Sequence, residues 1–143
     1  MKAITLADTH RRGFTLMEMI LVLAIISLLI GLGAYTMRNV LGDANLKKAQ
    51  ADVRNLETNL VRFKMKALFY PNQDQGLQAL VTRPTTGPKP KQWSQSLTSD
   101  ALLDPWGNPY QYANPAKRSS AAYDVYSMGQ DGKDGTEDDI GNW

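Results

Sequence analysis

The sequence predicts an α+β protein, in which a long N-terminal helix, transmembrane in its first half, packs on a small antiparallel β-sheet domain with a C-terminal acidic loop. Three observations predict this fold. Residues 19–37 are an uncharged apolar run, residues 46–67 carry an apolar stripe at heptad spacing, and residues 110–113 and 123–128 are two short strand-like segments. A chain of 143 residues has room for one such domain rather than two.

The apolar run is long enough to cross a membrane. It extends over the nineteen residues Met19–Met37 without a charge, and a spanning helix needs about 20 residues to cross about 30 Å of hydrocarbon. An ordinary secretory signal peptide has a shorter run, followed by a small-residue cleavage site that is missing here. Lys2, Arg11 and Arg12 precede the run, so we expect a cytoplasmic N-terminus and an outward-facing C-terminal part.

The helix is predicted to continue beyond the membrane as an amphipathic segment over residues 38–70. Apolar side chains recur there every three or four residues, which predicts a helix face packed on the small domain. A coiled coil is the alternative, but it needs a better pattern of flanking charges. The stripe consists of Leu46, Ala49, Val53, Leu56, Leu60, Phe63 and Ala67.

The segment after the helix is predicted to contain short elements joined by turns. Pro71 is expected to end the long helix, and Asp74 is expected to cap a short second helix. The stretch Asp104–Tyr110 is rich in turn-forming residues and leads into the strand at 110–113. The alternating segment at 123–128 is its predicted hairpin partner.

The composition excludes several classes of function. The chain has no cysteine, so disulfides, thiolate metal sites and cysteine nucleophiles are ruled out. The single histidine, His10, rules out a His-rich metal site. The formal charge of +2 does not suggest a nucleic-acid partner. The charge is nevertheless segregated, with a net +6 over residues 38–118 and a net −5 over residues 124–143.

The acidic segment at residues 128–139 is the candidate site. It combines five acidic residues with three glycines. Calcium takes six to eight oxygen ligands, and glycines allow the chain to fold tightly around it. The EF-hand pattern fails because Lys133 stands where an acid or amide is needed. The residues alone leave two interpretations open, a calcium site and a solvated acidic turn.

The start of the apolar run carries a second candidate site. Glu18 is a carboxylate at the edge of the run, so we expect it to reach the headgroups or to be neutralised by a cation. The segment Arg12–Glu18, followed by the run, resembles the class III signal of type IV pilin-like proteins. The resemblance implies cleavage after Gly13 by prepilin peptidase and N-methylation of Phe14. It also implies that Glu18 pairs with the Phe14 amine of a neighbouring subunit during assembly.

The rest of the chain extends this resemblance. The Asp104–Tyr110 turn and the acidic loop after the last strand resemble the major pseudopilins of the type II secretion system, and the resemblance covers nearly the whole chain. Members of that family hold one structural calcium ion in this loop. Carried over to this sequence, the resemblance implies side-chain ligands from Asp131, Asp138 and Asp139, and backbone carbonyl ligands from Met128 and Lys133.

The resemblance implies a structural subunit rather than an enzyme. Such a subunit forms a helical homopolymer, the periplasmic pseudopilus, and is anchored in the inner membrane before assembly. Its implied partners are further copies of itself, minor pseudopilins, prepilin peptidase and an inner-membrane assembly platform. The implied parts are a leader at 1–13, a transmembrane segment at 14–37, the helical continuation at 38–70 and a periplasmic region at 71–143.

Two other functions compete with this interpretation. A pilin of another type IV pilus-like fibre, serving adhesion, motility or DNA uptake, shares the N-terminal signal, but many such pilins carry a C-terminal cysteine pair. A membrane-tethered periplasmic enzyme needs an acid–base pair in a pocket. The acids of this chain lie together in one loop, which suits an ion better.

Overall fold

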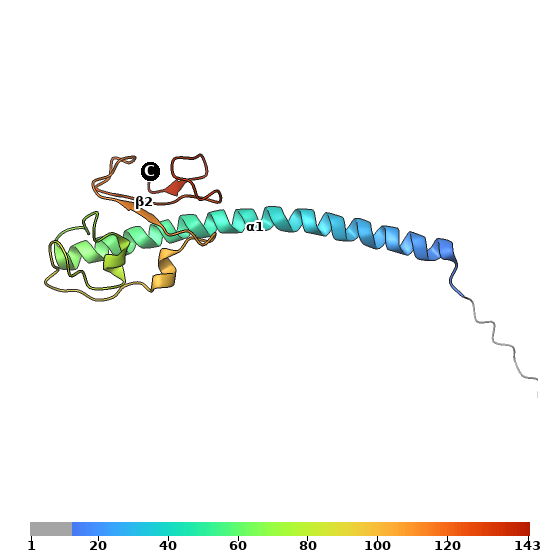
Figure 1. The fold of residues 1–143 in the computed structure, drawn as a ribbon, viewed down its shortest axis with the longest axis horizontal. Coiled ribbons are helices and arrows are strands. Elements are labelled where there is room, and N and C mark those ends of the chain that lie inside the picture. Colours follow the sequence, from blue (N-terminus) through green and yellow to red (C-terminus); the bar gives the residue numbers. More distant parts are fainter. Residues whose placement is uncertain (1–12) are drawn as a thin grey trace, which may run out of the picture. The chain divides into compact units, whose positions relative to one another are not determined.

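The structure is a computed structural model that describes residues 13–143, with the side chains of residues 34–36, 38 and 39 left out. The predicted leader lies outside the described residues except for Gly13. The chain divides after Val40 into two compact units, and α1 (Leu16–Ala67) contributes to both. The further elements are η1 (Leu77–Leu80), η2 (Ser99–Leu102), β1 (Gln111–Ala113), β2 (Asp124–Ser127) and β3 (Ile140–Gly141) (Figure 1).

The first unit contains the predicted membrane span. Helix α1 begins after Thr15, whose hydroxyl accepts a hydrogen bond from the backbone N–H of Glu18 at 3.2 Å. This is the arrangement of a helix N-cap. The window Leu16–Gly33 has a mean hydropathy of 2.5 and none of it is buried. A helix that is apolar on every face and uncovered in this way has the length and composition to span a bilayer.

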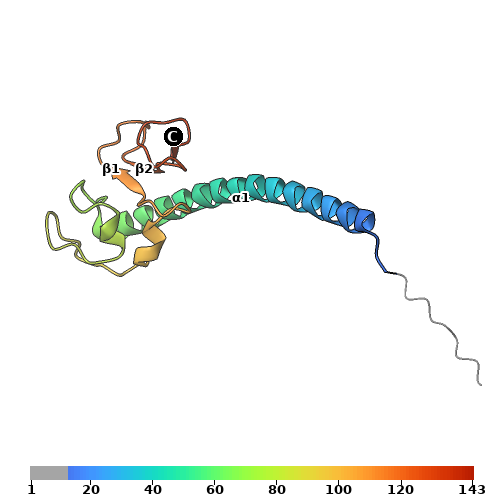
Figure 2. The same cartoon turned by 45° about the vertical axis from the view of Figure 1, so that its right-hand side comes forward.

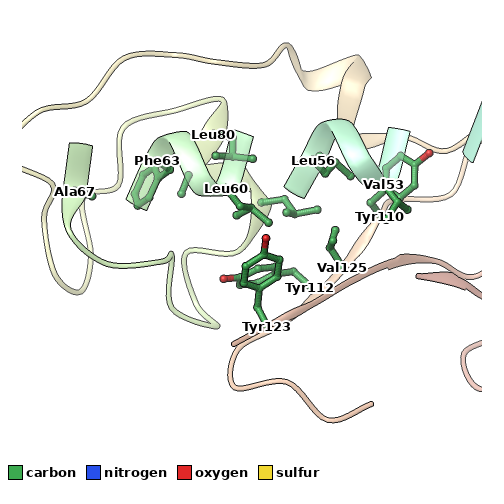
Figure 3. Packing of buried hydrophobic residues seen from close by; sticks show 12 residues of the cluster. Val53, Leu56, Leu60, Phe63, Ala67, Leu80, Tyr110, Tyr112, Tyr123 and Val125 are labelled. Atoms are coloured by element: carbon green, nitrogen blue, oxygen red, sulfur yellow. The ribbon is translucent and has the colours of Figure 1, made fainter. Parts of the chain in front are cut away.

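The second unit is built on the C-terminal half of α1. Within this unit the sheet lies on one side of the helix, and η1 and η2 lie on the other (Figures 1 and 2). The predicted stripe is the buried face of the helix, except that Leu46 is 41% exposed. The core combines this face with side chains of η1 and the sheet (Figure 3): Val53, Leu56, Leu60, Phe63, Ala67, Leu77, Ala79, Leu80, Tyr110, Tyr112, Tyr123 and Val125.

The long helix ends earlier than predicted. Leu68 has a φ of +69°, and its N–H donates to the Lys64 carbonyl at 2.7 Å. A residue in this left-handed conformation terminates a helix. The prediction that Pro71 ends the helix is therefore wrong by three residues. Pro71 instead serves the core, because its carbonyl accepts a hydrogen bond from the Tyr112 hydroxyl at 2.8 Å.

The predicted second helix is a single 3₁₀ turn, and Asp74 does not cap it. Gly76 precedes η1 and makes no side-chain cap. The turn before it is closed by Asn72 and Gln75, since each side-chain carbonyl oxygen accepts the other residue's backbone N–H, at 2.9 and 3.2 Å. These two reciprocal hydrogen bonds hold the turn before η1, in place of the predicted cap by Asp74.

The sheet has the order β1-β2-β3 and is antiparallel throughout. The predicted hairpin is confirmed: Tyr112 pairs with Val125 in register. Strand β3 was not predicted, because two residues are too short to show an alternating pattern. It pairs Tyr126 with Gly141. The acidic segment is therefore a loop closed at both ends by strands rather than a free tail.

Candidate metal-binding loop

The start of the acidic loop is fixed by the turn that precedes β1. Asp104 is buried, and its Oδ1 accepts the N–H groups of Trp106 at 3.0 Å and Asn108 at 2.8 Å. Its Oδ2 accepts the Ser127 hydroxyl at 2.6 Å. The Ser127 oxygen in turn accepts the Gly129 N–H at 3.1 Å. One carboxylate thus joins the turn to the last residue of β2 and the entry of the loop.

Gly129 is required by a close approach. Its φ is +66°, and a Cβ at this position would lie 2.4 Å from both the backbone oxygen and the Oδ2 of Asp138. No other residue type has room there, because both contacts are far below van der Waals distance. The far end of the loop is therefore folded back onto its beginning.

Three of the predicted ligand oxygens converge on one hydroxyl. The Thr136 Oγ1 lies 3.3 Å from Asp131 Oδ1, 3.1 Å from the Lys133 carbonyl oxygen and 2.6 Å from Asp138 Oδ1. A hydroxyl carries a single hydrogen, so it donates fully to only one of these acceptors. The Thr136 hydrogen bond lowers the pKa of Asp138. Asp131 Oδ1 also accepts the Lys133 N–H at 2.8 Å, so the three oxygens share the Thr136 hydroxyl and one backbone N–H.

Asp139 has different partners from the other two predicted carboxylate ligands. Its Oδ2 accepts Arg118 Nη1 at 2.5 Å and the Gly135 N–H at 2.8 Å. Its Oδ1 is buried and has no hydrogen-bond partner among the described residues. Arg118 also binds Asp134 Oδ1 through Nη2 at 2.6 Å, so one guanidinium holds two acids of the loop.

Arg118 is itself held in place by its surroundings. Its guanidinium lies 4.5 Å from the Tyr126 ring centroid and 5.1 Å from that of Trp143. The hydrogen bond to Asp139 raises its pKa above the usual value. Its backbone N–H donates to Asp124 Oδ2 at 2.8 Å. Asp124 thereby fixes the hairpin loop that carries Arg118.

The Asp124 carboxylate is strongly stabilised in its ionised form. Burial pushes its pKa upward. The hydrogen bonds from Ser119 and from the backbone N–H groups of Lys117 and Arg118 outweigh burial and lower the pKa to about 2. Sequence reasoning assigned Asp124 only to a strand.

The side chains of the loop are of the type that binds a hard cation. The structure brings only some of the predicted ligands together. All side-chain donors are carboxylates, the ligand type that calcium prefers. Asp131, Lys133 and Asp138 meet at Thr136, whereas Asp139 lies with Arg118. Among residues 13–143, no group of three or more His, Cys, Asp or Glu side chains is close enough to hold a metal ion. Met128 occupies the position directly after β2.

The N-terminal candidate residues lie at the start of α1. Glu18 is in the first helical turn, and its backbone is bound by the Thr15 cap. Phe14 is 75% exposed, and a Cβ on Gly13 would meet no described atom within 4 Å. Pairing between Glu18 and Phe14 involves two subunits, so it stays a prediction.

The long apolar helix, the small antiparallel sheet and the N-terminal signal define a pilin-like protein. Residues 8–34 match the family model described as "Prokaryotic N-terminal methylation motif". Residues 36–143 match the model described as "Type II secretion system (T2SS), protein G". The chain belongs to this protein G family of the type II secretion system.

Individual relatives agree with the family match. The chain is 40% identical over 138 residues to the type II secretion system core protein G of Pectobacterium carotovorum, covering 94% of this chain and 85% of the relative. It is 41% identical over 138 residues to the core protein G of Aeromonas hydrophila, covering 94% and 93%. Its fold resembles the crystal structure of the major pseudopilin from the type 2 secretion system of enterohaemorrhagic Escherichia coli, with a TM-score of 0.65. The two chains are 38% identical, and the match covers 73% of this chain and 87% of that one.

These findings confirm the predicted family, fold class and function. The protein is the major pseudopilin of a type II secretion system, a structural subunit rather than an enzyme. It is a pilin-like protein of the inner membrane and the periplasmic pseudopilus. Membership of the family implies polymerisation and processing by prepilin peptidase. The alternatives of another type IV pilus-like fibre and of a membrane-tethered enzyme are set aside.

Proposed function

We propose that the loop at residues 128–139 binds one calcium ion that stabilises the pseudopilin subunit. The observation that carries this proposal is the convergence of Asp131, Lys133 and Asp138 oxygens on a single Thr136 hydroxyl. Calcium supplies the positive charge that such a group of oxygens lacks. The proposed ligands are the side chains of Asp131, Asp138 and Asp139 and the backbone carbonyls of Met128 and Lys133.

The surrounding residues support this role by holding the loop in a folded state. Asp104 and Ser127 fix its entry, and Gly129 allows Asp138 to approach. The strand pairing of β3 with β2 closes its exit. The free energy of metal binding adds to the free energy of folding where an unoccupied site is less ordered.

Thermal unfolding of the full chain in detergent, with calcium chloride or with EDTA, tests the proposal. At a calcium concentration 100 times the Kd, the stabilisation is about 2.7 kcal/mol, so we expect a clearly higher melting temperature with calcium. Magnesium chloride at the same concentration is the control, because Mg²⁺ demands near-ideal octahedral geometry and dehydrates reluctantly. Identical melting curves in calcium and EDTA contradict the proposal.

We also propose specific processing and assembly roles for the N-terminal residues. Cleavage follows Gly13, the new amine of Phe14 is methylated, and Glu18 pairs with that amine on a neighbouring subunit. The exposed position of Phe14 and the family match over residues 8–34 support this assignment. Mass spectrometry of the mature N-terminus tests it: a methylated Phe14 is expected, and an intact Met1 contradicts it.

The charge of Glu18 is tested by assembly of the Glu18→Gln variant. Glutamine keeps the length and the helical position of the side chain, so it leaves the Thr15 cap intact while removing the carboxylate. We expect membrane insertion to persist and the fibre yield in the cell to fall sharply. Normal fibres from Glu18→Gln contradict the pairing.

The chain has three further regions and interacts with other components of the secretion system. Residues 14–37 form the membrane segment, the helix continues from residue 38 to Ala67, and residues 71–143 form the periplasmic region. The partners are minor pseudopilins and an inner-membrane assembly platform. The uncovered apolar side chains of α1 between Leu16 and Gly33 support a surface that is buried first in lipid and then in the fibre.

A further inference from the structure

Arg118 occupies an unusual position beside the acidic loop. It comes from the hairpin loop between β1 and β2, yet its guanidinium binds Asp134 and Asp139 of the distant loop between β2 and β3. The Asp139 side chain is only 4% exposed, whereas that of Asp134 is 60% exposed. The stronger constraint therefore falls on Asp139, which is shielded from water.

The two oxygens of Asp139 are used unequally. Oδ2 accepts both Arg118 Nη1 and the Gly135 N–H, whereas Oδ1 is buried without a partner among the described residues. A buried carboxylate oxygen without a partner is costly, and a bound cation is one of the few things that can satisfy it. A carboxylate that binds metal through one oxygen is commonly oriented by a hydrogen bond to the other.

Arg118 is well suited to hold a carboxylate in one orientation. Its planar guanidinium lies over the rings of Tyr126 and Trp143, and its backbone N–H is fixed by Asp124. Asp134 takes the second arm of the guanidinium. The two terminal nitrogens of the guanidinium thus bind different acids of the loop: Asp134 balances the charge of Arg118, and Asp139 is held in position by it.

We propose that Arg118 is a positioning residue of the calcium site, which holds Asp139 by Oδ2 and leaves Oδ1 to bind the ion. This inference rests on the proposed calcium function and assigns to that site a residue far from it in sequence. The repulsion between the guanidinium and the ion is offset because Asp134 also pairs with Arg118. Arg118 acts on the ion through Asp139.

Calcium titration calorimetry of the full chain in detergent tests this inference with calcium chloride as the probe. Loss of a group that orients a metal ligand typically lowers affinity 10- to 100-fold, so the Kd of Arg118→Gln should rise by about that factor. Arg118→Lys keeps the charge without the two-armed geometry and should fall between the native chain and Arg118→Gln. Arg62→Gln removes the same charge from an exposed position on α1 and should leave the Kd unchanged.

A double-mutant cycle separates positioning from general stabilisation. If Arg118 acts through Asp139, then adding Arg118→Gln to Asp139→Asn should weaken calcium binding by less than twofold beyond Asp139→Asn alone. Additive losses contradict the inference. Melting in EDTA identifies a variant that has failed to fold, and in that case Arg118→Lys carries the comparison.

The calcium titrations distinguish failure of the Arg118 role from failure of the proposed calcium binding. Absence of calcium binding by the native chain overturns the calcium function and the inference together. Native binding with an unchanged Kd in Arg118→Gln overturns the inference alone. Tighter binding by Arg118→Gln also overturns it, because it shows that Arg118 competes with the ion for Asp139.

Discussion

Replacing Asp104 by alanine should destabilise the acidic loop and the tertiary structure around it. Asp104 accepts three hydrogen bonds, from the N–H groups of Trp106 and Asn108 and from the Ser127 hydroxyl. A net contribution of about 1 kcal/mol for each bond gives a loss of about 3 kcal/mol. For a unit of about this size, each kcal/mol corresponds to roughly 4 °C, so the melting temperature should fall by about 12 °C.

The Asp104→Asn variant is the matched control. Asparagine keeps the volume and the oxygen that faces Trp106 and Asn108, and loses mainly the bond with Ser127. Its loss should therefore be about 1 kcal/mol. Near-ultraviolet circular dichroism of the full chain in detergent follows the loss of packing around Trp106 while the long helix dominates the far-ultraviolet signal. A fall of less than 1 kcal/mol in Asp104→Ala refutes the view that this carboxylate anchors the loop.

Two further predictions concern the second unit. Leu60→Ala removes a fully buried side chain at the centre of the core and should destabilise the unit by about 2–5 kcal/mol. Chemical denaturation measures this loss. Met65 is exposed, so Met65→Ala is the control that should change stability little. Folding lowers the pKa of Asp124 from an ordinary 3.8 to about 2. The ionised carboxylate therefore contributes about 2 kcal/mol to the free energy of unfolding above pH 4, and this contribution is lost as the pH falls through 2. Denaturation at pH 6 and pH 2 should show Asp124→Asn less stable than the native chain at pH 6 and nearly equal at pH 2; an equal deficit at both values contradicts this role.

The parts of the fold that follow from short-range patterns could be predicted from the sequence. The membrane span requires only a count of uncharged residues, and the core face of α1 requires only the spacing of its apolar residues. Leu46 is the exception within the stripe. It lies at the N-terminal edge of the second unit, where the spacing continues but the residue stays 41% exposed.

The parts that depend on contacts between distant residues could not be predicted. Arg118 reaches Asp139 across 21 positions, and no spacing rule connects them. The early end of α1 depends on the left-handed conformation of Leu68, which sequence preferences assign to glycine rather than leucine. Thr136 was missed because a threonine among acids carries no distinctive signal until the loop has folded around it.

The stacking of Arg118 on Trp143 gives the subunit an optical reporter of its own. The nearest Trp143 ring atom lies 2.3 Å from the point where a Cβ on Gly141 would be, so the indole lies close to the backbone of β3 and near the Arg118 guanidinium. Indole emission responds to nearby charge and to solvent. Fluorescence of the unlabelled subunit should therefore follow rearrangements of the loop during polymerisation, with Trp143→Phe supplying the background from the other tryptophans.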